Sequence, residues 1–313
     1  MNLSKLALAA ITAVTAISVS ACAVAPDGSD SNGERAAENC GLCIPQTPKI
    51  VHSEWSSYQI KIRDTSAGTS TTLPLNGRHP VLNADQSKVA FAGTDGNIYI
   101  ANASDGSGKI KLTSGGVFDS PAFSPDKTTI VFASVGTAGY GADIYKVVLA
   151  TGVVTKLTAN PGYWFFDPKF LDASTVVFQN GLDGTASFAL VPITAVNKST
   201  FTYLQGLPSG DFGDLSVAPG GAHVSLTKQH GSCGAQAVMI GTVSGATVSN
   251  LHETFCTAGF NSHGASIGGS NLVAFEWGSY ASTEYVYTIP LAGGSATYQG
   301  IYGGSDEVDM SMR

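Results

Sequence analysis

Positive charge is scarce in this chain and clusters nowhere along it. The 313 residues include 16 Lys and Arg against 23 Asp and Glu, so the formal net charge is −7, and only 12% of residues are charged. Nucleic-acid backbones and anionic lipid surfaces attract proteins through dense positive charge. The composition therefore argues against nucleic acid or a charged membrane surface as the main partner, and it indicates a solvated acidic surface.

Long hydrophobic sequence is also missing. One apolar stretch, residues 6–19, follows Lys5 and soon gives way to polar sequence. A membrane-spanning helix needs about 20 apolar residues, so this stretch is too short to be assigned as a span. A basic residue followed by a short apolar stretch is typical of an export signal, and we predict a signal peptide at residues 1–21.

The end of this segment, Val19-Ser20-Ala21-Cys22, resembles the bacterial lipobox. In that motif the cysteine is acylated through its sulfur and becomes the mature N-terminus. The resemblance predicts a lipid anchor on Cys22 as the only membrane attachment, and the lack of Asp at position 23 is similar to outer-membrane lipoproteins. The alternative is ordinary signal-peptidase cleavage near Ala21. With an anchor, the protein faces the periplasm or the cell surface.

Residues 22–48 contain the run Asp27-Gly-Ser-Asp-Ser-Asn-Gly33 and no β pattern. Short polar side chains and glycine cannot bury enough apolar surface to fold. We therefore predict a lipidated, flexible tether there, and we place the folded domain at residues 49–313.

Cysteine is scarce as well, and export permits disulfides between the four that remain besides Cys22. Cys40 and Cys43 have the spacing of a redox motif, but they precede any β pattern; a local bridge or two free thiols are the alternatives. Cys233 and Cys256 fall in two loops of one repeat and are candidates to pair. No second Cys/His pair has zinc-site spacing, which argues against a structural zinc ion.

Glycine, Thr and Val are abundant, and they favour β structure. The stretch 118–134 reads as strand, turn and strand around Ser124-Pro-Asp126, and two further strands follow at 143–149 and 153–158. Similar units recur at intervals of 41 to 50 residues, with first strands starting at Pro80, Pro121, Pro168, Leu215, Ala265 and Met310. This period with four strands a unit predicts a β-propeller.

The two ends of the domain complement each other. Residues 308–313 supply only a first strand, whereas residues 49–54, 58–64 and 69–75 supply a second, third and fourth strand. Joining them completes one more blade and leaves no exposed sheet edge at the closure. We therefore predict an all-β, six-bladed propeller with four-stranded blades, closed by the C-terminal strand.

The residues Pro121-Ala-Phe-Ser-Pro-Asp126, Ile130-Val-Phe-Ala-Ser134, Asp143-Ile-Tyr145 and Leu157-Thr158 resemble the WD40-like PD40 repeat of the TolB propeller family. The motif is full in this unit and weaker in the others. The resemblance implies the same propeller architecture over residues 49–313 and a role in the cell envelope.

Residues just before each first strand should crowd one mouth of the central channel. They supply one carboxylate or imidazole per unit: His79, Asp119, Asp167, Asp214, His263 and Asp309. Such a set could hold a ligand or a cation, with oxygen ligands favouring Ca²⁺ and imidazole favouring a transition metal. The alternative is that each aspartate accepts hydrogen bonds from its own turn. No other cofactor is predicted.

Aromatic residues lie near the predicted loops as Trp55 with Tyr58, the run 163–166, and Trp277 with Tyr280. Sugar or peptide recognition and packing between blades both use such side chains. The run Gly264-Ala-Ser-Ile-Gly268 matches a G-x-S-x-G nucleophile pattern, but no helix follows this predicted strand, so we assign it no catalytic role.

Two functions remain for this sequence. The first is an envelope scaffold that binds a protein or peptide, favoured by the absence of a recognisable nucleophile with its base. The second is a carbohydrate-active or metal-dependent enzyme, such as a polysaccharide lyase, at the channel mouth, favoured by the Asp/His set.

Calorimetric titration of the propeller domain with Ca²⁺, Mn²⁺ and Zn²⁺ tests the cation site. If the carboxylates and imidazoles converge, at least one metal gives saturable heat, because like charges crowded on one axis are relieved by a cation. The absence of heat at millimolar metal would remove the cation hypothesis.

Overall fold

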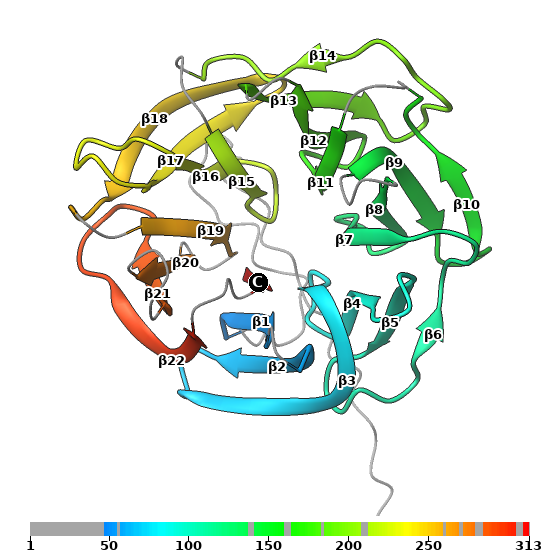
Figure 1. Ribbon diagram of the computed structural model, residues 1–313, viewed down its shortest axis with the longest axis horizontal. Helices are drawn as coiled ribbons and strands as arrows, with labels where there is room; N and C mark the ends of the chain where they lie inside the picture. Colours follow the sequence, from blue (N-terminus) through cyan, green and yellow to red (C-terminus); the bar gives the residue numbers. More distant parts are fainter. Residues whose placement is uncertain are drawn as a thin grey trace, which may run out of the picture. The chain divides into compact units, whose positions relative to one another are not determined.

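The computed structural model describes residues 47–54, 57–136, 141–159, 164–182, 185–207, 212–258, 261–268, 272–278, 284–304 and 309–312. These residues form β-sheets set around a central axis as a propeller (Figure 1). All pairings between neighbouring strands within these sheets are antiparallel. In the described part of the chain no helix is long and apolar enough to cross a membrane.

The first sheet has the strand order β23-β1-β2-β3-β4-β5-β6. Its strands are β1 (Lys49–Ser53), β2 (Gln59–Asp64), β3 (Thr69–Leu82), β4 (Lys88–Gly93), β5 (Ile98–Asn102), β6 (Ile110–Lys111) and β23 (Asp309–Met312).

Four further sheets follow, each of four strands. They are β7 (Phe118–Phe123), β8 (Thr129–Val135), β9 (Gly141–Val148) and β10 (Val153–Lys156); β11 (Trp164–Phe170), β12 (Thr175–Leu182), β13 (Thr185–Pro192) and β14 (Thr202–Tyr203); β15 (Phe212–Val217), β16 (His223–Lys228), β17 (Ala237–Ser244) and β18 (Thr247–Phe255); and β19 (Asn261–Ile267), β20 (Leu272–Gly278), β21 (Glu284–Pro290) and β22 (Thr297–Gly304).

The prediction of six separate blades was wrong: the described residues form five sheets. The reason lies in β3, which pairs with β2 from Thr69 to Asn76 and with β4 from Gly77 to Leu82, so that two expected blades share one strand. Gly77 sits at the changeover, where an added Cβ would come within 2.6 Å of the Ala92 carbonyl oxygen and would meet the Phe91 ring. A glycine lets the chain pass without a loop.

The ring closes where the sequence predicted. β23 pairs with β1 in antiparallel register, with Ile50 opposite Met312 and Ser53 opposite Asp309. β1 in turn pairs with β2, so the C-terminal strand completes a set begun by N-terminal strands. The closure leaves β1 no free edge for pairing with another chain.

A β-bulge interrupts the first strand of each repeat, which lies closest to the axis: the C-terminal part of β3 and strands β7, β11, β15 and β19. The register shifts at Arg78/Val81, Asp119/Ala122, Phe166/Lys169, Gly213/Ser216 and His263/Ser266. The first extra residue has positive φ at His79 (46°), Ser120 (51°), Asp167 (52°) and Asp214 (49°). The repeat prolines Pro80, Pro121 and Pro168 directly follow His79, Ser120 and Asp167. Because they lie in the bulge, their missing N–H groups break no hydrogen bond between the strands.

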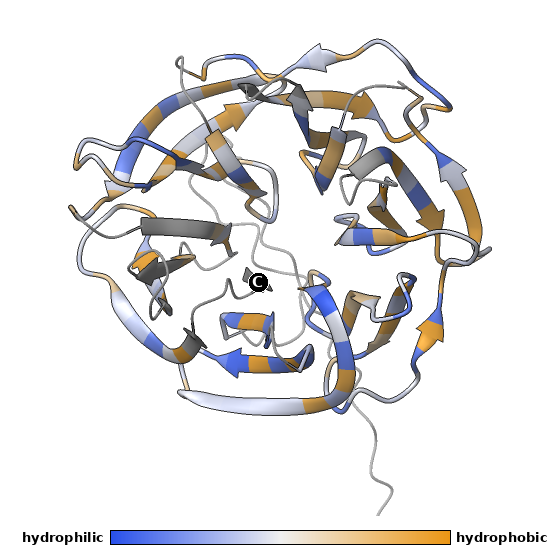
Figure 2. Cartoon of the chain, viewed as in Figure 1, coloured by the Kyte–Doolittle hydropathy of each residue, from blue (hydrophilic) through white to orange (hydrophobic). Residues whose placement is uncertain are grey.

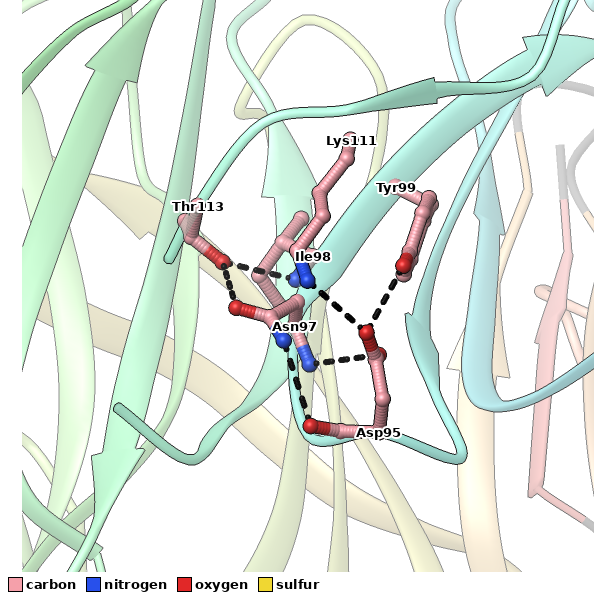
Figure 3. A network of polar contacts seen from close by, with 6 residues as sticks. All are labelled: Asp95, Asn97, Ile98, Tyr99, Lys111 and Thr113. Carbon is pink, nitrogen blue, oxygen red and sulfur yellow. Dashed lines mark hydrogen bonds and ion pairs between the residues drawn. The ribbon is translucent and has the colours of Figure 1, made fainter. Parts of the chain in front are cut away.

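The other motif residues tie the outer strands to the third strands. In Figure 3 the Ile98 amide donates to Thr113 Oγ1 at 2.9 Å, and that hydroxyl lies 3.4 Å from Asn97 Oδ1. The same bonds recur one set later, where the Ile144 amide donates to Thr158 Oγ1 and Thr158 donates to Asp143 Oδ1, both at 2.9 Å. Thr158 is fully buried. These residues therefore hold the blade together, so the motif is structural.

Each sheet buries both faces against its neighbours. In β8, Ile130 and Phe132 pack into a cluster with Ile98, whereas Val131 packs with Phe165 of the next blade. Hydrophobic and polar residues accordingly mix along the strands (Figure 2). The core is a series of layers between blades, and no blade is stable by itself.

His52 on β1 is a buried titratable group within this core, with 5% of its surface exposed. Burial lowers its pKa to about 4, and the charges of Lys61 and Arg63 act in the same direction against Glu54. The unfolded chain therefore binds a proton between pH 6.5 and 4 that the folded protein does not bind.

We predict that the free energy of unfolding falls by up to about 3 kcal/mol from this group between pH 6.5 and pH 4, and then levels off. Urea unfolding across this range should show a shallower pH dependence for His52→Phe than for the wild type. His230→Phe, at an exposed position, should keep the wild-type slope. Equal slopes for His52→Phe and the wild type would contradict the prediction.

Candidate functional site at the channel mouth

The bulges place polar side chains at the beginning of the inner strands. Arg78 and His79 lie in β3, and Asp119 lies in the neighbouring inner strand β7 (Figure 1). The left-handed backbone conformation of His79 interrupts the regular pairing of β3 with β4 at this point. The two strands thereby bring one carboxylate against two cationic or hydrogen-bonding side chains.

Asp119 is the centre of this cluster. Its Oδ1 lies 2.5 Å from His79 Nδ1 and accepts the Ser120 amide at 2.9 Å, while its Oδ2 lies 3.0 Å from Arg78 Nη2. The side chain of Asp119 is 15% exposed, whereas those of Arg78 and His79 are 33% and 41% exposed. A buried carboxylate therefore holds two side chains that still reach solvent.

Burial of Asp119 acts to raise its pKa, but the charge and hydrogen bond of His79, the charge of Arg78 and the Ser120 amide together hold the pKa below its usual value. Asp119 is thus ionised at neutral pH. The stabilisation that follows is present above the unfolded pKa of about 3.9 and is lost as the pH falls through the lower folded pKa.

The other predicted site residues are not equivalent to this cluster. Asp167 pairs with Lys169, and Asp214 accepts a hydrogen bond from Thr227 Oγ1 at 2.8 Å. His263 stands opposite Glu276, and Asp309 stands opposite Ser53, but their side chains lie outside the described ones. His79, Asp167 and Asp214 are first bulge residues, whereas Asp119 and His263 precede the bulge by one place.

No group of three or more His, Cys, Asp or Glu that could hold a metal occurs among the residues that the structure describes. The described aspartates of the set have protein partners instead, in line with hydrogen bonding at bulges and turns. A cation in the channel stays a prediction that depends on His263 and Asp309.

Arg78 was missed by the sequence analysis, although it directly precedes His79. Its charge two residues before the repeat proline was the available signal, but pairing across two blades cannot be seen in one repeat. Ser266 of the G-x-S-x-G run lies within β19 opposite Ala274 and is 8% exposed. It therefore sits in a strand, where no nucleophile turn is formed.

The structure describes some, but not all, of the cysteines and aromatic residues that the sequence singled out. A disulfide joins Cys233 and Cys256, and Glu253 beside it accepts the Ser232 amide at 2.7 Å. Cys22, Cys40 and Cys43 lie outside the described residues, as do Trp55, Tyr163 and Tyr280. Of the aromatic run, Trp164 is 47% exposed, whereas Phe165 is fully buried in the core.

The architecture is similar to that of solved TolB structures. TolB from Acinetobacter baumannii superposes with a TM-score of 0.66 at 16% identity, covering 85% of this chain and 66% of that one. A putative TolB from Agrobacterium tumefaciens gives 0.63 at 14% identity, covering 85% and 92%. The fold is a TolB-like β-propeller.

A puromycin-hydrolysing peptidase from Mycobacterium tuberculosis also resembles the chain, with a TM-score of 0.56 at 13% identity over 80% of this chain but 42% of the peptidase. At these identities the likeness shows the TolB-like propeller fold alone. No family model matches the sequence, and no curated protein matches it.

We predict that Arg78 and Asp119 are energetically coupled. A double-mutant cycle with Arg78→Ala and Asp119→Ala, measured by urea unfolding at pH 7, should give a coupling energy of about 1–2 kcal/mol, because the pair is partly desolvated. The exposed pair Lys111 and Asp95, 2.9 Å apart, is the matched control and should show almost none. Equal coupling in both pairs would show that burial adds nothing to the Arg78 pair.

Proposed function

We propose that the protein is an exported, lipid-anchored envelope protein whose propeller binds another protein or a peptide at the mouth formed by Arg78, His79 and Asp119. The observation that carries this proposal is the partly exposed pair of Arg78 and His79 held on one largely buried carboxylate. TolB-like structural neighbours support a binding scaffold at a coarse level.

The chemistry of the mouth suits a protein ligand. Guanidinium N–H groups bind carboxylates and backbone carbonyls, and a side chain fixed in advance loses less entropy on binding. Asp119 supplies that fixation, since its two oxygens contact Arg78 and His79 separately. The expected partner segment therefore presents acceptor groups to this mouth.

The point at which the chain enters the propeller supports an anchored scaffold. Gln86 Nε2 donates to the Thr47 carbonyl at 3.0 Å, so Thr47 lies beside the turn that follows β3. Arg78 and His79 lie at the other end of the same strand segment, Gly77 to Leu82. Thr47, the first described residue, thus lies at the end of this strand segment away from Arg78 and His79.

A second candidate is an enzyme at the same mouth, carbohydrate-active or metal-dependent. The specific observation in its favour is the 2.5 Å contact between His79 Nδ1 and Asp119 Oδ1. A carboxylate on one imidazole nitrogen orients the ring, as it does for catalytic general bases. Likeness to part of a peptidase fits a binding or an enzymatic role equally.

Co-purification from crosslinked bacterial envelopes tests both candidates. The wild-type chain should retain a partner that mass spectrometry identifies and that rebinds when purified, whereas Arg78→Ala and Asp119→Asn should bind it at least about tenfold more weakly. Asp95→Asn is the control, because the Asp95 carboxylate forms an exposed ion pair with Lys111.

Membrane fractionation of Cys22→Ser tests the anchor separately, and this variant should move from the membrane to the soluble fraction. If no partner is recovered and a polysaccharide is instead cleaved in a manner that His79→Ala abolishes, the enzyme candidate replaces the scaffold.

A further inference from the structure

An exposed group of tyrosines lies on the outer strands of the last blade, away from the inner strands that form the mouth. Tyr287 in β21 stands opposite Tyr298 in β22, and Tyr285 is two residues before Tyr287 on the same face. Tyr285 is 36% exposed and Tyr298 48% exposed. A single exposed ring is common on protein surfaces, but a cluster of exposed rings can mark a binding site.

The rings are held in place by one another and by the core. Tyr298 contacts Tyr285 edge to face, with centroids 5.6 Å apart, and contacts Tyr287 at the same distance. Tyr287 stacks at 6.2 Å on Phe275, which is fully buried. Gln299, also buried, ties β22 to β21 through a 2.7 Å hydrogen bond to Thr288 Oγ1. The tyrosines thus form a preorganised platform.

A groove of about 400 Å³ lies in the same junction between blades. It is lined by His223, Ile240, Gly241, Thr242, Asn250 and His252 from the β15–β18 blade and by Leu291 and Ala292 from the turn after β21. Leu291 and Tyr287 pack against one core cluster that also contains Ile240. The two blades are neighbours in the ring (Figure 1), and Tyr287 and Leu291 link the tyrosines and the groove through this shared cluster.

The polar groups of the groove can donate and accept hydrogen bonds. His252 Nδ1 lies 2.9 Å from the Asn250 carbonyl oxygen and donates to it. Asn250 Nδ2 donates to Thr242 Oγ1 at 3.2 Å, with the Asn250 backbone held at a φ of 51°. None of the described residues that line the groove is Asp, Glu, Lys or Arg.

Burial, together with Tyr298 and Tyr285, raises the pKa of Tyr287. This tyrosine therefore stays a neutral phenol. Flat apolar ring faces beside hydrogen-bond donors and acceptors match a ligand with C–H faces and many hydroxyls. An anionic polymer would need Lys or Arg, and neither is among the described residues that line the groove.

We propose that the tyrosine platform of Tyr285, Tyr287 and Tyr298 and the adjoining groove bind a neutral polysaccharide, with sugar rings stacked on the platform and hydroxyl groups bonded in the groove. This binding is independent of the channel mouth and of the partner proposed there.

Affinity electrophoresis of the full chain in gels that contain neutral polysaccharides, namely a mixed-linkage β-glucan, a galactomannan and an α-glucan, tests the proposal. At least one should retard the wild type, and Tyr285→Ala with Tyr298→Ala should weaken the affinity at least about tenfold. Tyr203→Ala is the matched control, because Tyr203 is 38% exposed on the outer strand β14 of another blade.

Calorimetry with matching oligosaccharides should give the same order of affinities, and the His252→Ala variant should bind more weakly with the platform intact. Circular dichroism and the unfolding midpoint establish that each variant is folded. No retardation by any of the three polymers would overturn the proposal. Equal losses for Tyr203→Ala, retention only by anionic alginate, or binding only of unstructured peptides would overturn it as well.

Discussion

The burial of both faces of every sheet is the constraint on which the rest of this molecule depends. Ile130 and Val131 are adjacent in β8 but belong to different core clusters, one on each side of the blade. A sheet with two apolar faces needs two neighbours, so the series of sheets must return to its start. The pairing of β23 with β1 meets this need, because it builds the closing set from both ends of the chain.

The same constraint explains where polar groups can stand. Near the central axis the inner strands lie close together. A side chain can therefore turn away from the regular strand direction only where a bulge interrupts the backbone pairing. The bulges at His79, Asp167 and Asp214 provide such interruptions, with a left-handed residue at each. Asp and His tolerate this conformation better than β-branched residues do. The polar mouth is therefore a consequence of how the blades are built.

Much of the fold was predictable because proline, turn aspartates and β-branched runs act locally. Ser124 and Thr128 bond to Asp126 as a tight turn requires, and the repeat prolines lie at bulges. The continuous strand β3 was not predictable, since nothing in its sequence shows that residues on either side of Gly77 pair with different strands. The site was predicted only in part, because Arg78 meets Asp119 across two repeats, and the equivalent positions His79 and Asp119 differ by one place at the bulge.

Departure from the repeat marks the parts of the ring that can acquire new roles. In the β7–β10 blade, the buried Thr158 and the aspartate beside it tie the outer strand to the core. In the last blade, the hydrogen bond of Gln299 to Thr288 and the stacking of Tyr287 on Phe275 join neighbouring strands. Rings that pack edge to face or stack stabilise a sheet, and at the surface they leave part of their area in water. A blade stabilised in this way keeps its place in the ring while its outer strands leave aromatic surface exposed, and this is the surface for which we propose polysaccharide binding.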